Sequence, residues 1–172
     1  YSVATHHHMG AVPRAGNDSG GGQLGNAIRC KPGGTNDFIY IVVQEAVWQA
    51  LAKRIGPEVG MPDLATDPMF ATIVERRRHQ NDMWEIIGEF ALYHTKRELM
   101  AILNEINVPC GPIMSTEDLA HDEHVRGRDM WVELDHPQRG KWWNVGMPIK
   151  LSGSPAVIKR SPTLGEHTEE VL

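Results

Sequence analysis

The segment of this sequence best suited to contact a ligand through its backbone amides is Ser19-Gly20-Gly21-Gly22-Gln23. Three adjacent glycines have no side chains to pack, and they lose the most conformational entropy on ordering. Their exposed amides can approach a ligand closely and donate hydrogen bonds to it. A flexible linker is the alternative interpretation, because Gly/Ser stretches are usually linkers. No Lys-Ser or Lys-Thr pair follows the glycines, which excludes a phosphate-binding P-loop.

The two cysteines do not form a site that the sequence can identify. Cys110 lies between Pro109 and Gly111 in an apolar context, which favours a buried structural thiol over a nucleophile. Together with Cys30 it makes neither a disulfide framework nor a zinc site. This cysteine usage fits a reducing, cytoplasmic compartment.

Several other groups of residues have a chemical and a structural interpretation, and the structural one is favoured. The histidine groups lack the spacing that metal ligands need. Glu166 and His167, as adjacent residues of a helix, point in different directions. Trp142 and Trp143, as adjacent residues of a strand, lie on opposite faces. A basic run is usually a solvated helix face, although it can also bind an anion. The groups are His6-His7-His8, Arg76-Arg77-Arg78, His121 with Asp122 and His124, Trp142-Trp143, and Glu166-His167. No metal site is predicted.

The composition is that of a globular protein. The 172 residues are 41% hydrophobic and 23% charged, enough for one domain or for a domain with an appendage. The net charge of −5 argues against nucleic-acid binding. No apolar run reaches membrane-spanning length, and there is no signal peptide, so no membrane partner is expected.

The apolar pattern predicts strands at both ends of a helical region. Residues 27–31 and 38–43 read as a hairpin, and 44–55 read as a helix that packs Trp48 and Leu51 on it. Val108 to Ile113 is expected to be extended, because two prolines exclude helix there. Further helices are expected at 73–78, 81–92, 95–106 and 115–120, with Thr95 and Glu98 forming a capping box, and a second hairpin at 131–135 and 141–145.

This order of elements predicts an α+β fold, in which a small antiparallel sheet and several helices precede an extended C-terminal linker. We divide the chain into a glycine-loop segment (1–25), a small α+β domain (26–151), and a linker (152–172) that ends as a helix begins, with Thr168 as its cap. The chain starts at Tyr1 and stops within that helix. We therefore expect a fragment of a longer protein, cut at both ends.

Four short segments of the sequence stand out: PRAGNDSGGGQ at 13–23, VPCGPIMS at 108–115, VELDHPQRG at 132–140 and SPTLGEHTEEVL at 161–172. They resemble the glycine loop, the Pro-Cys-Gly-Pro element, the late hairpin and the Leu-Gly-Glu-His-Thr element of the formyl-CoA:oxalate CoA-transferase branch of the family III CoA-transferases. The resemblance runs from about Val12 to the end of the chain. Ser19 stands where the family usually has the first of four glycines, and Leu24 where proline is common.

The resemblance implies the small domain and linker of an enzyme more than twice this length, whose two chains interlock. In that family an aspartate attacks an acyl-CoA, and the acyl-aspartyl anhydride must be kept from water. That aspartate lies upstream, so no nucleophile is assigned here, and Ser19 to Gln23 are expected to form the lid. Coenzyme A thioesters would be substrates, with no permanently bound cofactor. The alternatives are a non-catalytic interaction module derived from this domain, or a related family III transferase or racemase.

Overall fold

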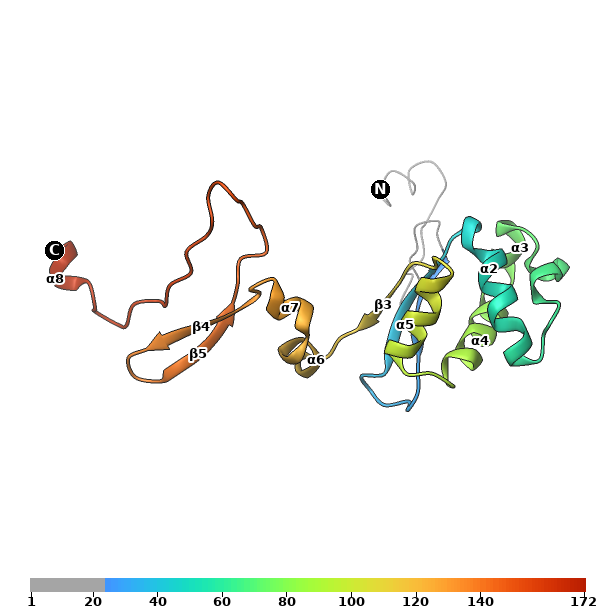
Figure 1. The fold of residues 1–172 in the computed structure, drawn as a ribbon, viewed down its shortest axis with the longest axis horizontal. Coiled ribbons are helices and arrows are strands. Elements are labelled where there is room, and N and C mark those ends of the chain that lie inside the picture. Colours follow the sequence, from blue (N-terminus) through green and yellow to red (C-terminus); the bar gives the residue numbers. More distant parts are fainter. Residues whose placement is uncertain (1–23) are drawn as a thin grey trace, which may run out of the picture. The chain divides into compact units, whose positions relative to one another are not determined.

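The structure is a computed structural model that describes residues 24–172, and Figure 1 shows its elements in order. The chain divides into two compact units, Tyr1–Ile113 and Met114–Leu172, which we call the first and second unit. The first contains a three-stranded antiparallel sheet with helices, and the second contains a two-stranded hairpin with short helices. The predicted α+β class is confirmed. The boundaries predicted from the sequence, after residues 25 and 151, refer to the domains of the longer protein of which this chain is expected to be a part, and they remain a proposal.

The sheet of the first unit has the order β1-β2-β3. β1 (Leu24–Arg29) pairs antiparallel with β2 (Phe38–Val43), as the sequence predicts, with Ala27 opposite Tyr40. β3 (Cys110–Ile113) pairs with the other side of β2 and turns the predicted extended segment into a third strand. A proline is tolerated there because β3 is an edge strand.

The first strand begins earlier than the sequence predicts. It starts at Leu24 rather than Ala27, because Leu24 is buried and lies on the same face as Ile28, which is buried too. It ends at Arg29, and Lys31 instead forms an isolated parallel bridge with Thr95. The expectation that 24 and 25 belong to the loop is therefore wrong, since both are strand residues.

One face of the sheet carries the core of the first unit. Alternate residues of β2, Ile39, Ile41 and Val43, are fully buried. Their side chains join one apolar cluster with residues of the helices drawn beside the sheet (Figure 1). As predicted, Trp48 and Leu51 belong to this cluster. The helices are α2 (Glu45–Ile55), α4 (Gln80–Ala91) and α5 (Lys96–Glu105).

Local signals set the ends of these helices. Thr95 and Glu98 form the predicted capping box of α5, in which each side chain accepts from the other residue's backbone amide. Thr72 caps α3 (Ile73–Arg78) in the simpler way. Between α2 and α3 the chain makes three 3₁₀ turns, η1 (Gly56–Val59), η2 (Leu64–Thr66) and η3 (Pro68–Phe70).

Arg76 corrects the prediction of a solvated basic face. Its side chain is 1% exposed, donates to the Phe70 carbonyl at 2.6 Å, and pairs with Glu45. The guanidinium lies over the Trp48 ring, 5.2 Å from the centroid. A buried charge needs such partners. Phe70 lies just before α3, whereas Glu45 and Trp48 belong to α2, which is distant in sequence. Arg77 and Arg78 are exposed, as predicted.

The second unit is built from short elements. Ser115 and Asp118 form a capping box for α6 (Thr116–His121), and Asp122 caps α7 (Glu123–Gly127), a helix that the sequence reading missed. The predicted hairpin is present as β4 (Trp131–His136) and β5 (Gly140–Val145). At α8 (Thr168–Val171) the N-cap is His167, so the expectation that Thr168 is the cap is wrong. Within residues 24–172, no helix is long and apolar enough to cross a membrane.

Candidate functional site

The predicted site residues Ser19, Gly20, Gly21, Gly22 and Gln23 lie outside the described residues. The structure does describe the junction that follows them. Leu24 is 3% exposed and pairs with Val43 at the end of β2. The glycine segment (residues 19–23) is therefore joined directly to a strand that is fixed in the sheet.

Tyr40 lies against this junction. Gly25 and Tyr40 are on the same face of the sheet, one diagonal step apart, because Tyr40 is opposite Ala27. A Cβ atom added to Gly25 would lie 2.8 Å from the Tyr40 hydroxyl oxygen and 3.3 Å from the ring carbon that bears it. The hydroxyl end of the ring thus occupies the space above Gly25. Sequence reasoning missed this contact, although a glycine inside a strand is a known sign of close approach.

The sequence favours a buried structural thiol at Cys110, but in the structure Cys110 is only partly buried, whereas Cys30 is fully buried. Burial raises the pKa of Cys30 to about 11, and the nearby Asp37 carboxylate adds to this effect. Burial also raises the pKa of Cys110, whose Sγ lies 3.8 Å from the Asn104 side-chain oxygen. A thiol with a raised pKa carries little thiolate at neutral pH. Both cysteines are free.

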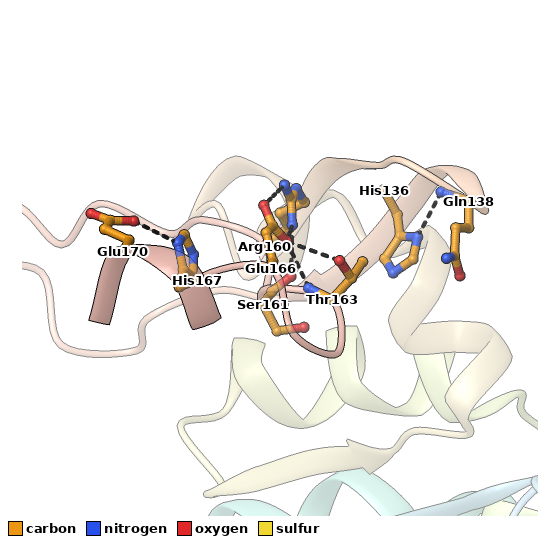
Figure 2. A network of polar contacts seen from close by, with 8 residues as sticks. All are labelled: His136, Gln138, Arg160, Ser161, Thr163, Glu166, His167 and Glu170. Carbon is orange, nitrogen blue, oxygen red and sulfur yellow. Dashed lines mark hydrogen bonds and ion pairs between the residues drawn. The ribbon is translucent and has the colours of Figure 1, made fainter. Parts of the chain in front are cut away.

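A polar network organises the C-terminal segment (Figure 2). Arg160 donates two hydrogen bonds to the Glu166 carboxylate, at 2.7 and 2.5 Å, and the Thr163 amide donates a third at 2.7 Å. The hydrogen bond from Arg160, followed by that from Thr163, lowers the pKa of Glu166 to about 2. Residues six apart are not in contact in either a helix or a strand, so this pair could not be found from the sequence. The only local signal is the turn chemistry of Pro162 and Gly165.

As the sequence interpretation expected, Glu166 and His167 do not form an acid–base pair. Glu166 is held by Arg160, whereas His167 Nδ1 lies 3.0 Å from the Glu170 carboxylate (Figure 2). His136, also drawn in Figure 2, accepts at Nδ1 from the backbone amides of Gln138 and Arg139, both at 3.2 Å. That histidine therefore shapes the hairpin turn.

In the group of His121, Asp122 and His124, the aspartate has a structural role. Asp122 accepts a hydrogen bond from the Val125 amide as the cap of α7, and the neighbouring histidines His121 and His124 are exposed. Across the part of the chain that the structure describes, no three His, Cys, Asp or Glu side chains are grouped so that they could hold a metal ion.

The adjacent tryptophans occupy opposite faces of the second hairpin, as predicted. Trp142 is opposite Leu134, and Trp143 is opposite Glu133. Each indole lies under an arginine: Arg139 is 5.3 Å from one ring centroid, and Arg126 is 5.7 Å from the other. Both rings are about half exposed. Cation–π contact and strand geometry thus account for them without a stacked ligand.

The sequence model of CoA-transferase family III matches residues 1–168. The chain belongs to CoA-transferase family III. The described residues carry three of the four segments on which the resemblance was based. They form β3 and the cap of α6, the β4–β5 hairpin, and the Arg160–Glu166 turn that leads into α8.

Two bacterial proteins named formyl-CoA:oxalate CoA-transferase are similar over almost the whole chain. The one from Rhodopseudomonas palustris (strain BisB18) is 48% identical over 164 residues, which is 94% of this chain and 38% of the relative. The one from Streptomyces coelicolor is 46% identical over 160 residues, or 93% of this chain and again 38% of the relative. This family III chain therefore spans less than two fifths of the length of these relatives.

Solved structures support the fold. A CAIB/BAIF family protein from Brucella suis superposes with a TM-score of 0.72 at 21% identity, covering 99% of this chain and 42% of that one. Rv3272 from Mycobacterium tuberculosis superposes with a TM-score of 0.63 at 18% identity, covering 83% of this chain and 38% of Rv3272. At this identity the likeness shows that the family III fold is shared, and nothing about substrates.

Proposed function

We propose that this chain is the small domain and linker of an enzyme that moves coenzyme A from formyl-CoA to oxalate. The observation that carries the proposal is the 48% identity, over 94% of the chain, with a relative named formyl-CoA:oxalate CoA-transferase. The glycine segment at 19–23 is consistent with this branch of the family.

The proposed reaction needs a carboxylate nucleophile that residues 1–172 do not supply. In the family scheme an upstream aspartate attacks the thioester carbonyl of formyl-CoA and releases the CoA thiolate. The thiolate then attacks the aspartyl carbonyl and expels formate. Oxalate displaces the thiolate to give a second anhydride, and the thiolate finally attacks the oxalyl carbonyl. Oxalyl-CoA leaves and the aspartate is restored, so every bond broken is matched by one formed.

The role proposed for the described residues is to position the lid. Anhydrides hydrolyse when water reaches them, so a loop that excludes water and donates amides to developing oxyanions would protect the intermediates. The segment from Ser19 to Gln23 is proposed to be that loop. Its attachment to β1 through the buried Leu24 would give it a fixed base. A fixed base favours reproducible placement of backbone donors, which catalysis by preorganised hydrogen bonds requires.

The partners follow from the same proposal. Acyl-CoA and small carboxylates are the substrates, coenzyme A is not permanently bound, and the parent is an interlocked homodimer. The two free cysteines fit a cytoplasmic location.

The test is to express the complete coding region and to follow the formation of oxalyl-CoA and formate from formyl-CoA and oxalate. Other acyl-CoA donors and carboxylic acids serve as competing substrates. We expect the formyl-CoA and oxalate pair to give the highest kcat/KM. A clear preference for another donor would transfer the protein to a different branch of the family. No transfer with any donor would support the non-catalytic module.

The 172-residue chain alone provides the matched control. We expect it to show no transfer above background, because the attacking carboxylate is absent. We also expect it to self-associate in sedimentation experiments, because it exposes many large apolar side chains, Trp143, Ile149 and Leu151 among them. Measurable formyl transfer by this chain would contradict the proposed location of the nucleophile.

A further inference from the structure

We propose that the groove between the outer edge of β1 and α4 binds an extended segment of another protein that carries basic side chains. The segment would add a strand to the sheet beside β1, and its basic side chains would face the carboxylates of Glu85 and Glu89. This binding activity is separate from the proposed CoA transfer. Every residue that it needs lies between Leu24 and Leu92.

The strand β1 has one unpaired edge. In the order β1-β2-β3 it lies at the margin of the sheet, and β2 is its only strand partner among the described residues. The Cys30 amide donates to the Asp37 carbonyl, and backbone groups alternate in direction along an antiparallel strand. The backbone groups of Gly25, Ala27 and Arg29 therefore point away from β2. A row of such unpaired donors and acceptors is a template for a further strand.

The edge is open over a defined length. At its far end the Lys31 amide donates to the His94 carbonyl at 2.8 Å, so the loop before α5 closes the edge there. Within the open part, the Ala27 amide donates to the side-chain oxygen of Asn26 at 2.8 Å. The carbonyls along this edge accept no hydrogen bond from residues 24–172. An incoming strand would thus find free acceptors and would displace only one side chain.

A groove with a cavity volume of about 800 Å³ runs along this edge, and α4 forms its other wall. Trp84 lines it with a ring that is 9% exposed. Gly88 also lines it, and a Cβ atom built there would meet nothing within 4 Å. An extended backbone can therefore lie beside β1 and against α4 without meeting a side chain at Gly88.

The charges of the groove determine which segment fits. Glu85 and Glu89 line it from α4, are exposed, and pair with no other residue among 24–172. Arg29 also lines it, but its guanidinium lies over the Phe38 ring, 5.4 Å from the centroid. Phe38 precedes the buried Ile39, so Arg29 and Phe38 lie on the face of the sheet turned away from the core. The two carboxylates are thus left for basic side chains of a partner.

A second copy of this chain is disfavoured as the occupant by the same charges. Antiparallel pairing of two β1 edges keeps the same face of both sheets on one side, so two α4 helices would lie next to each other. Glu85 and Glu89 of both copies would then repel. A basic strand brings opposite charges instead, since every second side chain of a strand faces the same way.

The experiment measures binding of synthetic hexapeptides to the complete protein by isothermal titration calorimetry. The probe is acetylated Lys-Thr-Lys-Thr-Lys-Thr amide. The controls are Lys-Lys-Lys-Thr-Thr-Thr, which has the same charge, and Glu-Thr-Glu-Thr-Glu-Thr. We expect the probe to bind at least about tenfold more tightly than either control, because only a strand with alternating basic residues turns all of them toward α4. Equal binding of the two basic peptides, or no binding of the probe, would overturn the proposal.

Methylated peptides test whether the segment pairs with β1. Two versions of the probe carry N-methyl groups on alternate amides, one version in each register. A bound strand turns only one set of its amides toward β1, so we expect one version to bind and the other to lose binding. Equal binding of both versions would show that no strand is added, and would overturn the proposal.

Substitutions on α4 locate the site. Glu85→Lys and Glu89→Lys should each weaken binding of the probe at least about fivefold, and the double variant should prefer the acidic peptide. Asp82→Lys is the matched control, because Asp82 is an exposed acid of the same helix that does not line the groove. It should change the affinity less than about twofold. Equal losses from Glu89→Lys and Asp82→Lys would reduce the effect to overall charge and overturn the proposal.

Filling the groove gives a test without any change of charge. Gly88→Leu should weaken binding of the probe at least about tenfold without lowering the thermal midpoint, because leucine favours a helix more than glycine does. Unchanged binding by this variant would overturn the proposal. So would a probe that binds the 172-residue chain but not the complete protein, since the groove would then be covered within the protein itself. None of these measurements depends on CoA transfer.

Discussion

The two units of this chain are stabilised in different ways. Every buried apolar side chain among residues 24–172 lies between Leu24 and Val108, in the first unit. From 114 to 172 the only buried residue is Gly146, although this stretch contains a hairpin, short helices and a bidentate ion pair. The first unit has a core around which its elements pack, whereas the second has local structure without one.

The comparison shows what local interactions can and cannot achieve. Capping, hairpin hydrogen bonds and cation–π contacts define the elements of the second unit, yet each contributes little by itself. An isolated hairpin is marginally stable at best in water. The second unit also exposes large apolar side chains, among them Val145, Ile149, Leu151 and Val157. An exposed apolar surface of this size is typical of one that contacts other protein. This chain covers only 38% of the length of the Rhodopseudomonas palustris relative.

The largest expected effect comes from the same substitution made in each unit. Leu51→Ala removes a side chain that is 1% exposed and should lower the free energy of unfolding by about 3 kcal/mol. Leu151→Ala removes one that is 57% exposed and should change it by less than about 0.5 kcal/mol. Urea unfolding of both variants, followed by far-UV circular dichroism at low concentration, measures the difference. A comparable loss from Leu151→Ala would show that the second unit has a core of its own.

A substitution in the glycine segment should separate activity from stability. Replacing Gly21 or Gly22 with Ala in the complete enzyme should lower turnover at least about tenfold, because a Cβ obstructs close approach of the loop and one lost oxyanion donor costs about a hundredfold. Binding of CoA and the thermal midpoint should hardly change, since the core of the first unit is not involved. Steady-state kinetics and thermal melts on both variants test this. Unchanged turnover in both would return the segment to the linker interpretation.

Each unit contains a helix with a capping box, α5 in the first and α6 in the second, and removing each cap should have a smaller effect that again differs between the units. Thr95→Ala should cost about 1 kcal/mol of unfolding free energy in the first unit, because α5 carries Leu99 and Leu103 into the core. Ser115→Ala removes the equivalent cap from α6, which buries no residue, and should only fray that helix. Amide hydrogen exchange distinguishes a global from a local effect. Equal effects on the slowest-exchanging amides would mean that α6 also belongs to a cooperative core.

The smallest effect is confined to one turn of the second unit. With its pKa lowered to about 2, Glu166 keeps its charge and its pairing with Arg160 well below the usual carboxyl range. The pair therefore adds stability to the turn above about pH 4.3, the ordinary pKa of Glu. That contribution is lost as the pH falls through about 2. Arg160→Gln should raise the midpoint toward the ordinary value in a carboxyl carbon-13 NMR titration, and Lys159→Gln should leave it in place. A midpoint that is the same in both variants would exclude Arg160 as the cause.

Much of the local structure could be predicted from the sequence. The apolar faces of the 38–43 strand and of α2, α4 and α5, the capping box at Thr95, and the second hairpin follow from periodicity and turn chemistry, and the structure confirms them. Four short motifs in the correct order also indicated the family, which the match over residues 1–168 confirms. These features depend on residues within a few positions of one another, so the sequence records them directly.

Only the tertiary structure decided which distant residues meet. Arg76 is buried against Glu45 and Trp48, Gly25 lies under Tyr40, and the 110–113 segment becomes a third strand. None of these contacts has a period that a sequence can display, because each joins elements whose separation is set by packing. A basic run looks the same whether it is solvated or buried, and a strand glycine looks the same whether the space above it is empty or filled. The fold supplies the neighbour, and the neighbour determines what the residue does.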